Sequence, residues 1–249
     1  MSIVQPEVFD TVNGASVVQN TSANLPFESI TESIEAFARG EFVIVLDNDS
    51  RENEGDLIIA AEDLTTEKMA FMIRYTSGYI CAAIPESRAT SLDLPKMVNK
   101  TADPYRTAYT ITIDAPGLGV STGISAHDRA HTCRSLALPS AMPSSFRRPG
   151  HILPLRALDG GVRARFGHTE AAVELCRLAG KQPAAALCEM ILDGEEVPGK
   201  PMRIGGGMMR RDDCLEFGRK WGIKVCTIDD LVTYVEETEG KLDIPGVNY

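Results

Sequence analysis

Short apolar strands and capped helices alternate along most of this 249-residue sequence, and this alternation restricts the possible fold more than any other feature. Ser29 and Glu32 have the spacing of a capping box, which predicts a helix that ends at Gly40. Two apolar strands follow, over 42–46 and 57–61. The short distance between them predicts a hairpin with a long polar tip.

The rest of the chain mixes the two kinds of element in the same way. Helices are expected over 67–75, from Ser125 to just before Pro139, and over 170–179, 213–221 and 230–235. Strands are expected over 79–84, 107–115, 184–192 and 224–228, with a strand pair near Gly160 and Gly161, while 85–103 and 143–154 should be loops. We therefore predict an α+β fold, a single domain with a mixed β-sheet covered by helices on both faces.

The first residues lack this periodicity. Residues 1–26 are rich in Ser, Asn, Val and Gln and are expected to be a flexible N-terminal leader, with the single domain over 27–249. They contain no basic start followed by an apolar stretch, and no run approaches the roughly 18 apolar residues of a membrane span. We expect a cytoplasmic protein with no membrane partner, whose six scattered cysteines are reduced.

Charge is distributed unevenly along the chain. The 25 basic and 35 acidic residues give a net charge of −10, which argues against a nucleic-acid partner held by bulk charge. Between Arg129 and Arg165, however, seven arginines face one acid, Asp159, and no lysine. The planar guanidinium matches phosphate oxygens in pairs, so this segment suits a small phosphorylated ligand. More than half of these arginines are nevertheless expected in surface or interface salt bridges.

The predicted hairpin tip, 47–56, carries five carboxylates in ten positions. Such a charge density repels itself unless cations or water relieve it, and a hard divalent metal would do so. A solvated tip without a ligand is the alternative. A calcium-binding helix–loop–helix is excluded, because strands flank the loop and Glu52 stands where that motif needs glycine.

Three further positions are candidates for chemistry. Arg165, His168 and Thr169 lie where a helix is expected to begin, which favours an anion site, although Thr169 could be only an N-cap and His168 only a residue outside the helix. His168 together with the acidic loop would favour magnesium or manganese over zinc. Glu189 stands in an apolar strand, either paired with an arginine or moving protons, and His151 follows a Pro-Gly turn.

Taken together, these motifs have a recognisable order. They are RENEGD at 51–56, GISAHDRAHT at 123–132, RPGH at 148–151, GHTE at 167–170 and the embedded Glu189. From about residue 27 to 236 the sequence resembles the 3,4-dihydroxy-2-butanone 4-phosphate synthase family. The resemblance implies a homodimeric lyase of riboflavin biosynthesis that depends on Mg²⁺ (or Mn²⁺) and converts D-ribulose 5-phosphate into L-3,4-dihydroxy-2-butanone 4-phosphate and formate.

The same resemblance implies the roles of individual residues. It implies Glu52 and His168 as metal ligands, Arg51, Asp56, Arg165, Thr169 and Glu189 as substrate contacts, and His151 and Glu189 as essential to the chemistry. It implies no role for His127 or His131. The chain lacks the zinc-binding cysteines of the cyclohydrolase to which bacterial relatives are often fused, so it is expected to be monofunctional.

The chemistry of such a rearrangement agrees with these residue types. A ketose phosphate that reacts through an enediol needs a Lewis acid, a base for a carbon-bound proton and a phosphate anchor. We expect Asp56 to remove the C3 proton, and Arg165 and Thr169 to hold the phosphate. Another metal-assisted sugar-phosphate isomerase or aldolase would use the same groups, and a phosphosugar-binding module without catalysis is a further alternative. The proposed mechanism depends on the acidic tip folding against His168, so that one divalent ion and one sugar phosphate share a pocket.

Overall fold

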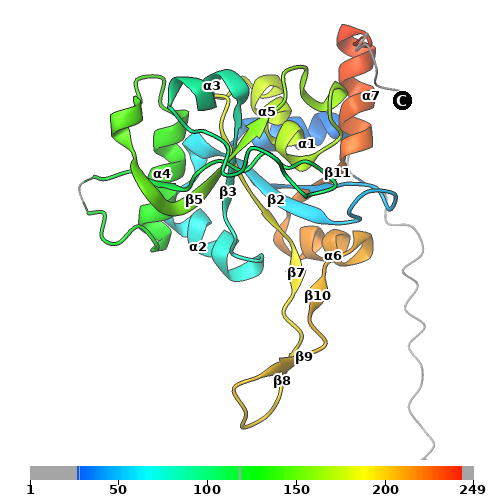
Figure 1. Cartoon of the computed structure of the whole chain (residues 1–249). Helices are drawn as coiled ribbons and strands as arrows, with labels where there is room; N and C mark the ends of the chain where they lie inside the picture. Colours follow the sequence, from blue (N-terminus) through cyan, green and yellow to red (C-terminus); the bar gives the residue numbers. More distant parts are fainter. Residues whose placement is uncertain (1–26, 28, 118, 243–249) are drawn as a thin grey trace, which may run out of the picture.

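The computed structural model describes residues 27, 29–117 and 119–242, which are built around one mixed β-sheet (Figure 1). The predicted leader, 1–26, lies outside the described residues. The sheet has seven strands in the order β11-β1-β2-β6-β3-β5-β4. Their bounds are β1 Val43–Leu46, β2 Gly55–Ala60, β3 Cys81–Pro85, β4 Ile113–Asp114, β5 Arg147–Ala157, β6 Ala185–Glu189 and β11 Lys224–Thr227. β1 is parallel to β11 and β3 to β5, and the other neighbours are antiparallel.

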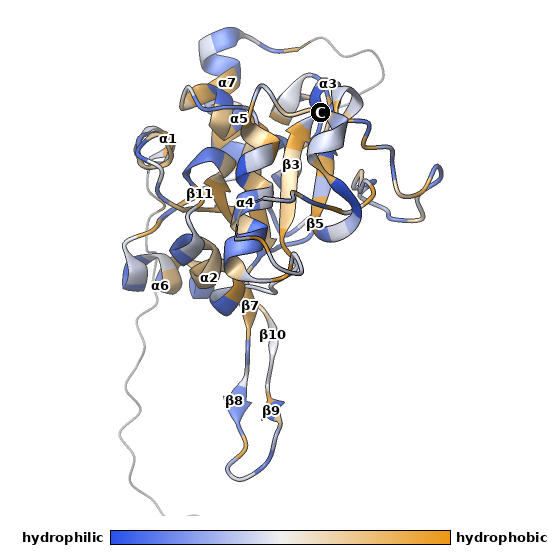
Figure 2. Cartoon of the chain, turned by 90° about the vertical axis from the view of Figure 1, so that its left-hand side faces the viewer, coloured by the Kyte–Doolittle hydropathy of each residue, from blue (hydrophilic) through white to orange (hydrophobic). Residues whose placement is uncertain are grey.

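Helices cover both faces of this sheet, as Figures 1 and 2 show from two sides. One face carries α1 Ile30–Ala38, α5 His168–Leu178 and α7 Ile228–Glu239, and the other carries α2 Thr66–Tyr75, α4 Ala126–Ala137 and α6 Arg211–Trp221. Successive strand residues point to opposite faces of the sheet. Val43 therefore packs on the face that carries α1, α5 and α7, and Ile44 packs on the other face. A short helix, α3 Glu86–Ser91, follows β3 within a stretch expected to be a loop. The predicted α+β class is confirmed.

Local helix signals placed several elements correctly. The Ser29 hydroxyl accepts from the Glu32 backbone N–H at 3.2 Å, and the Glu32 carboxylate accepts from the Ser29 N–H at 3.1 Å. At α4, Ser125 accepts from the Asp128 N–H at 3.1 Å, but the Asp128 carboxylate accepts instead from Ser121 and Gly123. The second capping box is therefore half formed, because Asp128 ties the preceding loop to the helix.

Three sequence predictions were wrong between residues 107 and 163. Residues 143–154 are not a loop, because β5 starts at Arg147 after a 3₁₀ turn at Pro143–Ser145. Residues 107–115 make only isolated bridges before β4. No strand pair forms at Gly160, where the chain takes a left-handed turn (φ 98°) into a 3₁₀ turn at Gly161–Arg163.

Pro154 accounts for two of these differences, the strand at 147–154 and the lack of a continuous strand over 107–112. Its carbonyl accepts from the Thr110 N–H at 3.0 Å, so Pro154 presents its backbone polar groups away from β3. The missing N–H of proline therefore leaves the β3 pairing intact, while a continuous ladder with 107–112 is prevented. The prolines that predicted a loop are thus compatible with a strand near the edge of the sheet.

A two-stranded arm projects from the body between β6 and α6 (Figures 1 and 2). It comprises β7 Ile191–Leu192 paired with β10 Gly207–Met208, and β8 Glu195–Glu196 paired with β9 Arg203–Ile204. The sequence predicted one strand through Leu192 and a flexible connection or mobile lid at Gly205–Gly207. Most of the arm is exposed, since it extends beyond the reach of the core.

Two expectations from the sequence concerned membrane-spanning segments and the state of the cysteines. No helix within residues 27, 29–117 and 119–242 has the length and apolar character that a membrane crossing requires. The six cysteines are free and buried, mostly among core side chains.

Candidate active site

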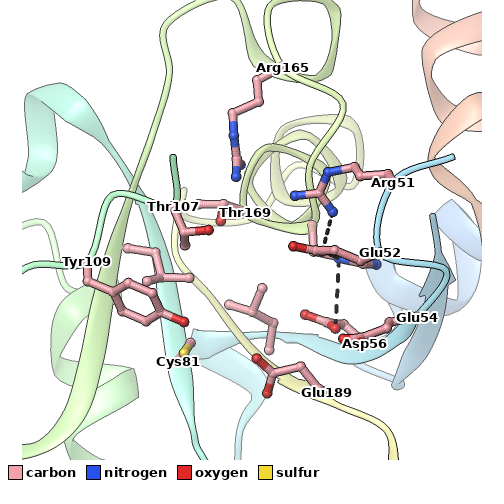
Figure 3. A pocket seen from close by; sticks show the side chains of 13 residues that line it. Arg51, Glu52, Glu54, Asp56, Cys81, Thr107, Tyr109, Arg165, Thr169 and Glu189 are labelled. Carbon is pink, nitrogen blue, oxygen red and sulfur yellow. Dashed lines mark hydrogen bonds and ion pairs between the residues drawn. The ribbon is translucent and has the colours of Figure 1, made fainter. Parts of the chain in front are cut away.

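A pocket opens on the face of the sheet that carries α5, beside the adjoining ends of β2 and β6 (Figure 3). Its wall contains every residue that the sequence proposed for the site except His151. These residues are Arg51, Glu52, Asp56, Arg165, His168, Thr169 and Glu189. Three separate segments supply them, and the sheet order places β2 next to β6 with Asp56 opposite Glu189.

One end of the pocket is anionic. His168 Nδ1 lies 3.7 Å from Glu52 Oε2 and 3.8 Å from Asp56 Oδ1. The side chains of His168 and Asp56 are almost fully buried, whereas that of Glu52 is one quarter exposed. The acidic hairpin tip thus folds against the start of α5, as the sequence analysis required.

Burial and mutual interaction shift the pKa values of these groups. Burial raises the pKa of Asp56, and the neighbouring carboxylates of Glu189 and Glu52 raise it further against the opposing effect of His168. Burial alone would lower the pKa of His168, but Asp56 and Glu52 outweigh it and raise that pKa. Burial likewise opposes the ionisation of Glu52, yet the hydrogen bond and charge of His168 hold its pKa below the usual value. The site therefore holds one carboxyl suited to accept protons near neutrality beside an ionised one.

These residues fit a hard divalent cation. In an octahedral Mg²⁺ site with metal–ligand distances near 2.0–2.1 Å, adjacent ligand atoms lie about 2.9 Å apart and opposite ones about 4.1 Å apart. Glu52 Oε2 and His168 Nδ1 are 3.7 Å apart, so a shift of less than about 1 Å would let them bind one ion. Asp56 Oδ1 and His168 Nε2 are buried without a hydrogen-bond partner. Buried polar atoms are ordinarily satisfied, so a missing ligand at this end is a direct explanation.

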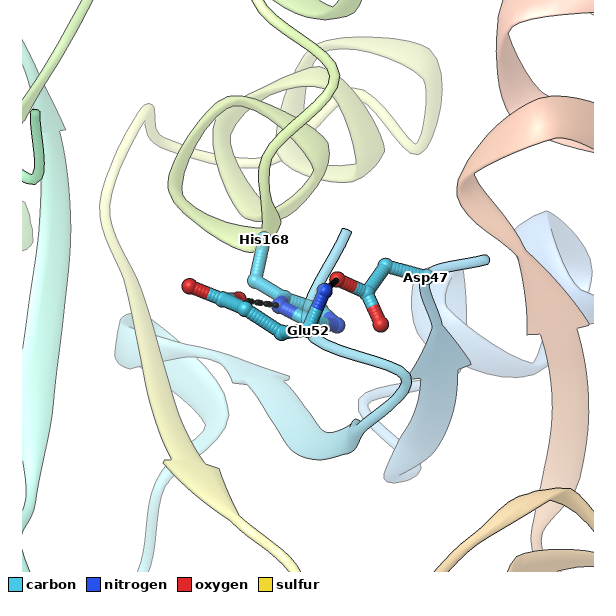
Figure 4. Close-up of side chains that lie close together, drawn as sticks. All are labelled: Asp47, Glu52 and His168. Carbon is cyan, nitrogen blue, oxygen red and sulfur yellow. Dashed lines mark hydrogen bonds and ion pairs between the residues drawn. The ribbon is translucent and has the colours of Figure 1, made fainter. Parts of the chain in front are cut away.

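Asp47 lies close to the same pair but serves a different purpose (Figure 4). Its carboxylate accepts from the backbone N–H groups of Glu52 at 2.9 Å and Glu54 at 2.7 Å, and it pairs with Arg51 Nη1 at 2.9 Å. With both oxygens accepting donors from the protein, Asp47 braces the loop and is a poor metal ligand.

The other end of the pocket is cationic. In Figure 3 Arg165 enters from above and Arg51 from the right, and Thr107 and Thr169 lie beside them. Arg165 donates to Glu170 Oε2 at 2.6 Å and to the Tyr105 carbonyl at 3.0 and 3.2 Å. These bonds use three of its five N–H donors and leave two for a ligand.

The start of α5 adds to this cationic end. Gly167 is the N-cap of the helix, so His168 is its first residue and Thr169 its second. Thr169 is therefore not the N-cap and His168 is not outside the helix, which corrects two of the alternatives considered from sequence. The hydroxyl of Thr169 is directed to the pocket, next to the unpaired N–H groups of the first turn, an arrangement that favours phosphate.

Most of the other arginines of the basic segment bind parts of the protein outside the pocket. Within the described chain three of the seven, Arg156, Arg163 and Arg165, form ion pairs, so the predicted salt bridges for more than half are not shown. Arg129 donates to the Gly78 carbonyl, Arg148 to that of Leu92, and Arg156 pairs with Glu86. Each ties a loop or helix to its neighbour. Only Arg165 of this segment lines the pocket.

His151 lies apart from this group, near the start of β5. Its Nδ1 is 2.7 Å from Asp114 Oδ2, and its backbone N–H donates to Asp114 Oδ1 at 2.8 Å. Asp114 thus fixes the orientation of the ring, which is about two-fifths exposed. Within one chain His151 is not part of the pocket wall, whereas Glu189 is, held by the Ser77 hydroxyl at 3.0 Å.

Sequence reasoning missed part of the wall. Thr107 and Tyr109 come from the segment that crosses β5, and Tyr105 from the same segment donates its hydroxyl to the Arg51 carbonyl at 2.7 Å. The segment was expected to be an ordinary strand, and no motif in the sequence distinguishes these residues from their neighbours. Cys81 also lines the pocket, and burial raises the pKa of its thiol.

Comparisons with known proteins agree on one family. The sequence profile described as 3,4-dihydroxy-2-butanone 4-phosphate synthase matches residues 31–234. A protein of that name from Pyricularia oryzae is 60% identical over 220 residues, covering 88% of this chain and 94% of the relative. The protein of that name from Candida albicans is 53% identical over 211 residues, covering 85% and 98%. A crystal structure of the synthase in complex with two magnesium ions matches with a TM-score of 0.85 and 61% identity, over 87% of this chain and 100% of that one.

Proposed function

Because the chain belongs to the 3,4-dihydroxy-2-butanone 4-phosphate synthase family of riboflavin biosynthesis, we propose that it is a magnesium-dependent lyase acting on D-ribulose 5-phosphate. The products are L-3,4-dihydroxy-2-butanone 4-phosphate and formate. Their atoms together equal those of the substrate, so the reaction needs no oxidant, reductant or other co-reactant.

One observation carries this proposal: a single pocket joins a cationic helix terminus to a buried carboxylate–imidazole cluster. Arg165, Thr169 and the first turn of α5 fit a phosphate, and Arg51 lies beside them. The acidic end then faces the ketone and hydroxyl groups of the same molecule. A binding module for phosphosugars would require the first end but not the second.

Glu52 and His168 would hold the metal at the acidic end, as their separation allows. When bound, Mg²⁺ supplies a Lewis acid for the carbonyl and hydroxyl oxygens of the substrate. A structure of a similar chain in complex with two magnesium ions supports magnesium as the metal. We expect Mn²⁺ to substitute, because it accepts the same oxygen and nitrogen ligands.

Asp56 is the base in this scheme. Its buried carboxyl, with a raised pKa, accepts the proton from C3 of the substrate and can return it to a later species. Glu189 lies opposite Asp56 across β2 and β6, where it can exchange protons with the substrate hydroxyls during dehydration, migration of the carbon skeleton and hydration. Arg165 and Thr169 hold the phosphate fixed during these steps.

His151 enters the scheme through a second subunit. The resemblance makes it essential, yet it is not part of the pocket wall of its own chain. We infer a homodimer in which the ring, oriented by Asp114, completes the pocket of the partner subunit. The exposed edge of the imidazole is available for this purpose.

Mixed dimers test this arrangement. Differently tagged Glu52→Gln and His151→Ala chains are co-expressed, and the heterodimer is isolated. If sites are shared between subunits, one of its two sites is intact and about half of wild-type activity returns, although both homodimers are inactive. A heterodimer without activity, or a monomeric enzyme, would show that His151 acts within its own chain or not at all.

The domain organisation and the cellular compartment are further parts of the proposal. The described residues form one seven-stranded sheet with helices on both faces and a small two-stranded arm, which supports a single domain over 27–249 after the leader 1–26. The free, buried cysteines suit a reducing compartment, and we propose the cytoplasm.

The decisive experiment is product analysis. Purified protein with ribulose 5-phosphate and Mg²⁺ should release formate in equal amount to the four-carbon phosphate, and addition of EDTA should stop it. A five-carbon isomer would indicate an isomerase and a smaller aldehyde an aldolase. Absence of any product, with retained sugar-phosphate binding, would leave only a binding module.

A further inference from the structure

The loop that carries Glu52 is held from outside the pocket by a residue that is distant in sequence. Arg210 Nη1 donates to the Glu52 carbonyl at 3.0 Å and also to the Asn53 carbonyl. Arg210 is not part of the pocket wall and follows the arm, 158 residues beyond Glu52.

The loop backbone is shaped to receive this side chain. Asn53 adopts a left-handed conformation (φ 52°), which asparagine tolerates better than most residues. Its own N–H donates to the Asn48 carbonyl at 3.2 Å, closing the turn on the inside. The carbonyls of Glu52 and Asn53 are consequently free to accept from one guanidinium nitrogen.

A short backbone ladder fixes the starting point of Arg210. The Met190 N–H donates to the Gly55 carbonyl at 2.8 Å, and the Met209 N–H donates to the Met190 carbonyl at 3.0 Å. Met190 is fully buried. The residue before Arg210 is therefore connected, through two hydrogen bonds, to the strand residue that ends the acidic loop.

Asp47 holds the same loop from the opposite side. It accepts from the backbone N–H groups of Glu52 and Glu54, while Arg210 donates to the carbonyls of Glu52 and Asn53. The backbone N–H groups of the loop are thus bound by a negatively charged side chain, and its carbonyls by a positively charged one.

We propose that Arg210 is a positioning residue that sets the Glu52 carboxylate at the distance from His168 that binding of a divalent cation requires. This rests on the proposed role of Glu52 and His168. Groups that orient metal ligands without touching the metal change affinity by roughly 10- to 100-fold when removed. Arg210 contacts only backbone of the loop, so its loss should weaken metal binding without removing a ligand.

The test compares Arg210→Met with Arg210→Lys and with a matched control, Arg211→Met. Arg211 is the adjacent arginine, which pairs with Asp212 and stacks on Phe27 rather than on the loop. Mg²⁺ binding to metal-free protein is measured by calorimetry, and backbone hydrogen exchange of 48–54 is measured in EDTA. The Arg210→Met chain should bind Mg²⁺ about 10-fold more weakly and exchange faster in the loop. Arg210→Lys should recover part of both effects, and Arg211→Met should match wild type.

Saturating Mg²⁺ should restore kcat of Arg210→Met to within about threefold, because every ligand is still present. Unchanged Mg²⁺ affinity and loop exchange would overturn the inference, and so would a loss of kcat that Mg²⁺ does not restore. A Glu52→Gln chain measured in parallel distinguishes a failure of the proposed metal site from a failure of the role of Arg210. If it binds Mg²⁺ like wild type, the proposed metal site itself is wrong. If it loses binding while Arg210→Met does not, only the role of Arg210 is wrong.

Discussion

Two hairpins of the described chain carry carboxylates, and only one of them forms part of the site. The loop between β1 and β2 and the arm between β6 and α6 both combine carboxylates with glycine. The first loop is bound by Asp47, Arg210 and Tyr105 and lies against α5. The arm extends from the body, and its ion pair between Arg203 and Glu196 is largely exposed.

The difference teaches that carboxylates favour a bound cation where the structure holds them together and removes them from water. Carboxylates in the arm remain hydrated and can move apart, so their repulsion is small. Those of the first loop are held together by backbone hydrogen bonds and partly removed from water, so a cation relieves a real cost. The two hairpins differ in composition, since Lys200 and Arg203 offset most of the negative charge of the arm, and they differ also in the structure that surrounds them.

The strongest test of this comparison replaces one acid in each hairpin. Glu52→Gln removes a proposed metal ligand, and formate production should fall by roughly 10³-fold, since Lewis-acid stabilisation is worth several kcal/mol. Glu196→Gln removes an exposed carboxylate in the arm and should change turnover by less than about twofold. Comparable losses in both variants, measured at saturating Mg²⁺, would contradict the distinction.

A glycine in each hairpin provides the second test. A Cβ at Gly55 would lie 2.8 Å from Cys214 Sγ and 3.0 Å from Leu46 Cδ2, so Gly55→Ala overpacks the base of the loop. We expect a loss of about 1–3 kcal/mol in the free energy of unfolding, measured by urea denaturation. Gly207→Ala has open space around the new methyl group and should stay within about 0.5 kcal/mol of wild type.

The double variant Gly55→Ala with Cys214→Ala checks the cause of that loss. Removing the sulfur makes room for the methyl group, so the two changes should destabilise by less than their sum. Strict additivity would mean that Gly55 matters for another reason, such as backbone freedom.

Removal of the arm should have the smallest effect. Leu192 and Gly207 are paired across the arm, so residues 193–206 can be replaced by Asn-Gly, which favours a two-residue turn. Turnover and the concentration of Mg²⁺ that gives half-maximal activity should both stay within about twofold of wild type. A large change in either would show that the arm contributes to the site, and would remove the contrast drawn above.

The structure also separates what the sequence could predict from what it could not. Capping boxes, the β1–β2 hairpin and the acidic tip are encoded within a few residues, and these predictions were confirmed or nearly so. Proline and glycine patterns misled where tertiary pairing decided, as at β5, because the missing N–H of Pro154 happens to face away from β3.

The sequence by itself determined the fold class, the family and most of the side chains of the pocket, because these depend on local periodicity and on residue types at fixed spacing. Only the tertiary structure decided which residues support them. Arg210 reaches the Glu52 loop because the sheet places β2 beside β6 and the chain leaves β6 through the arm, and His151 is separated from the pocket for the same kind of reason. Contacts between residues more than 100 positions apart depend on strand order and register, which no short segment specifies.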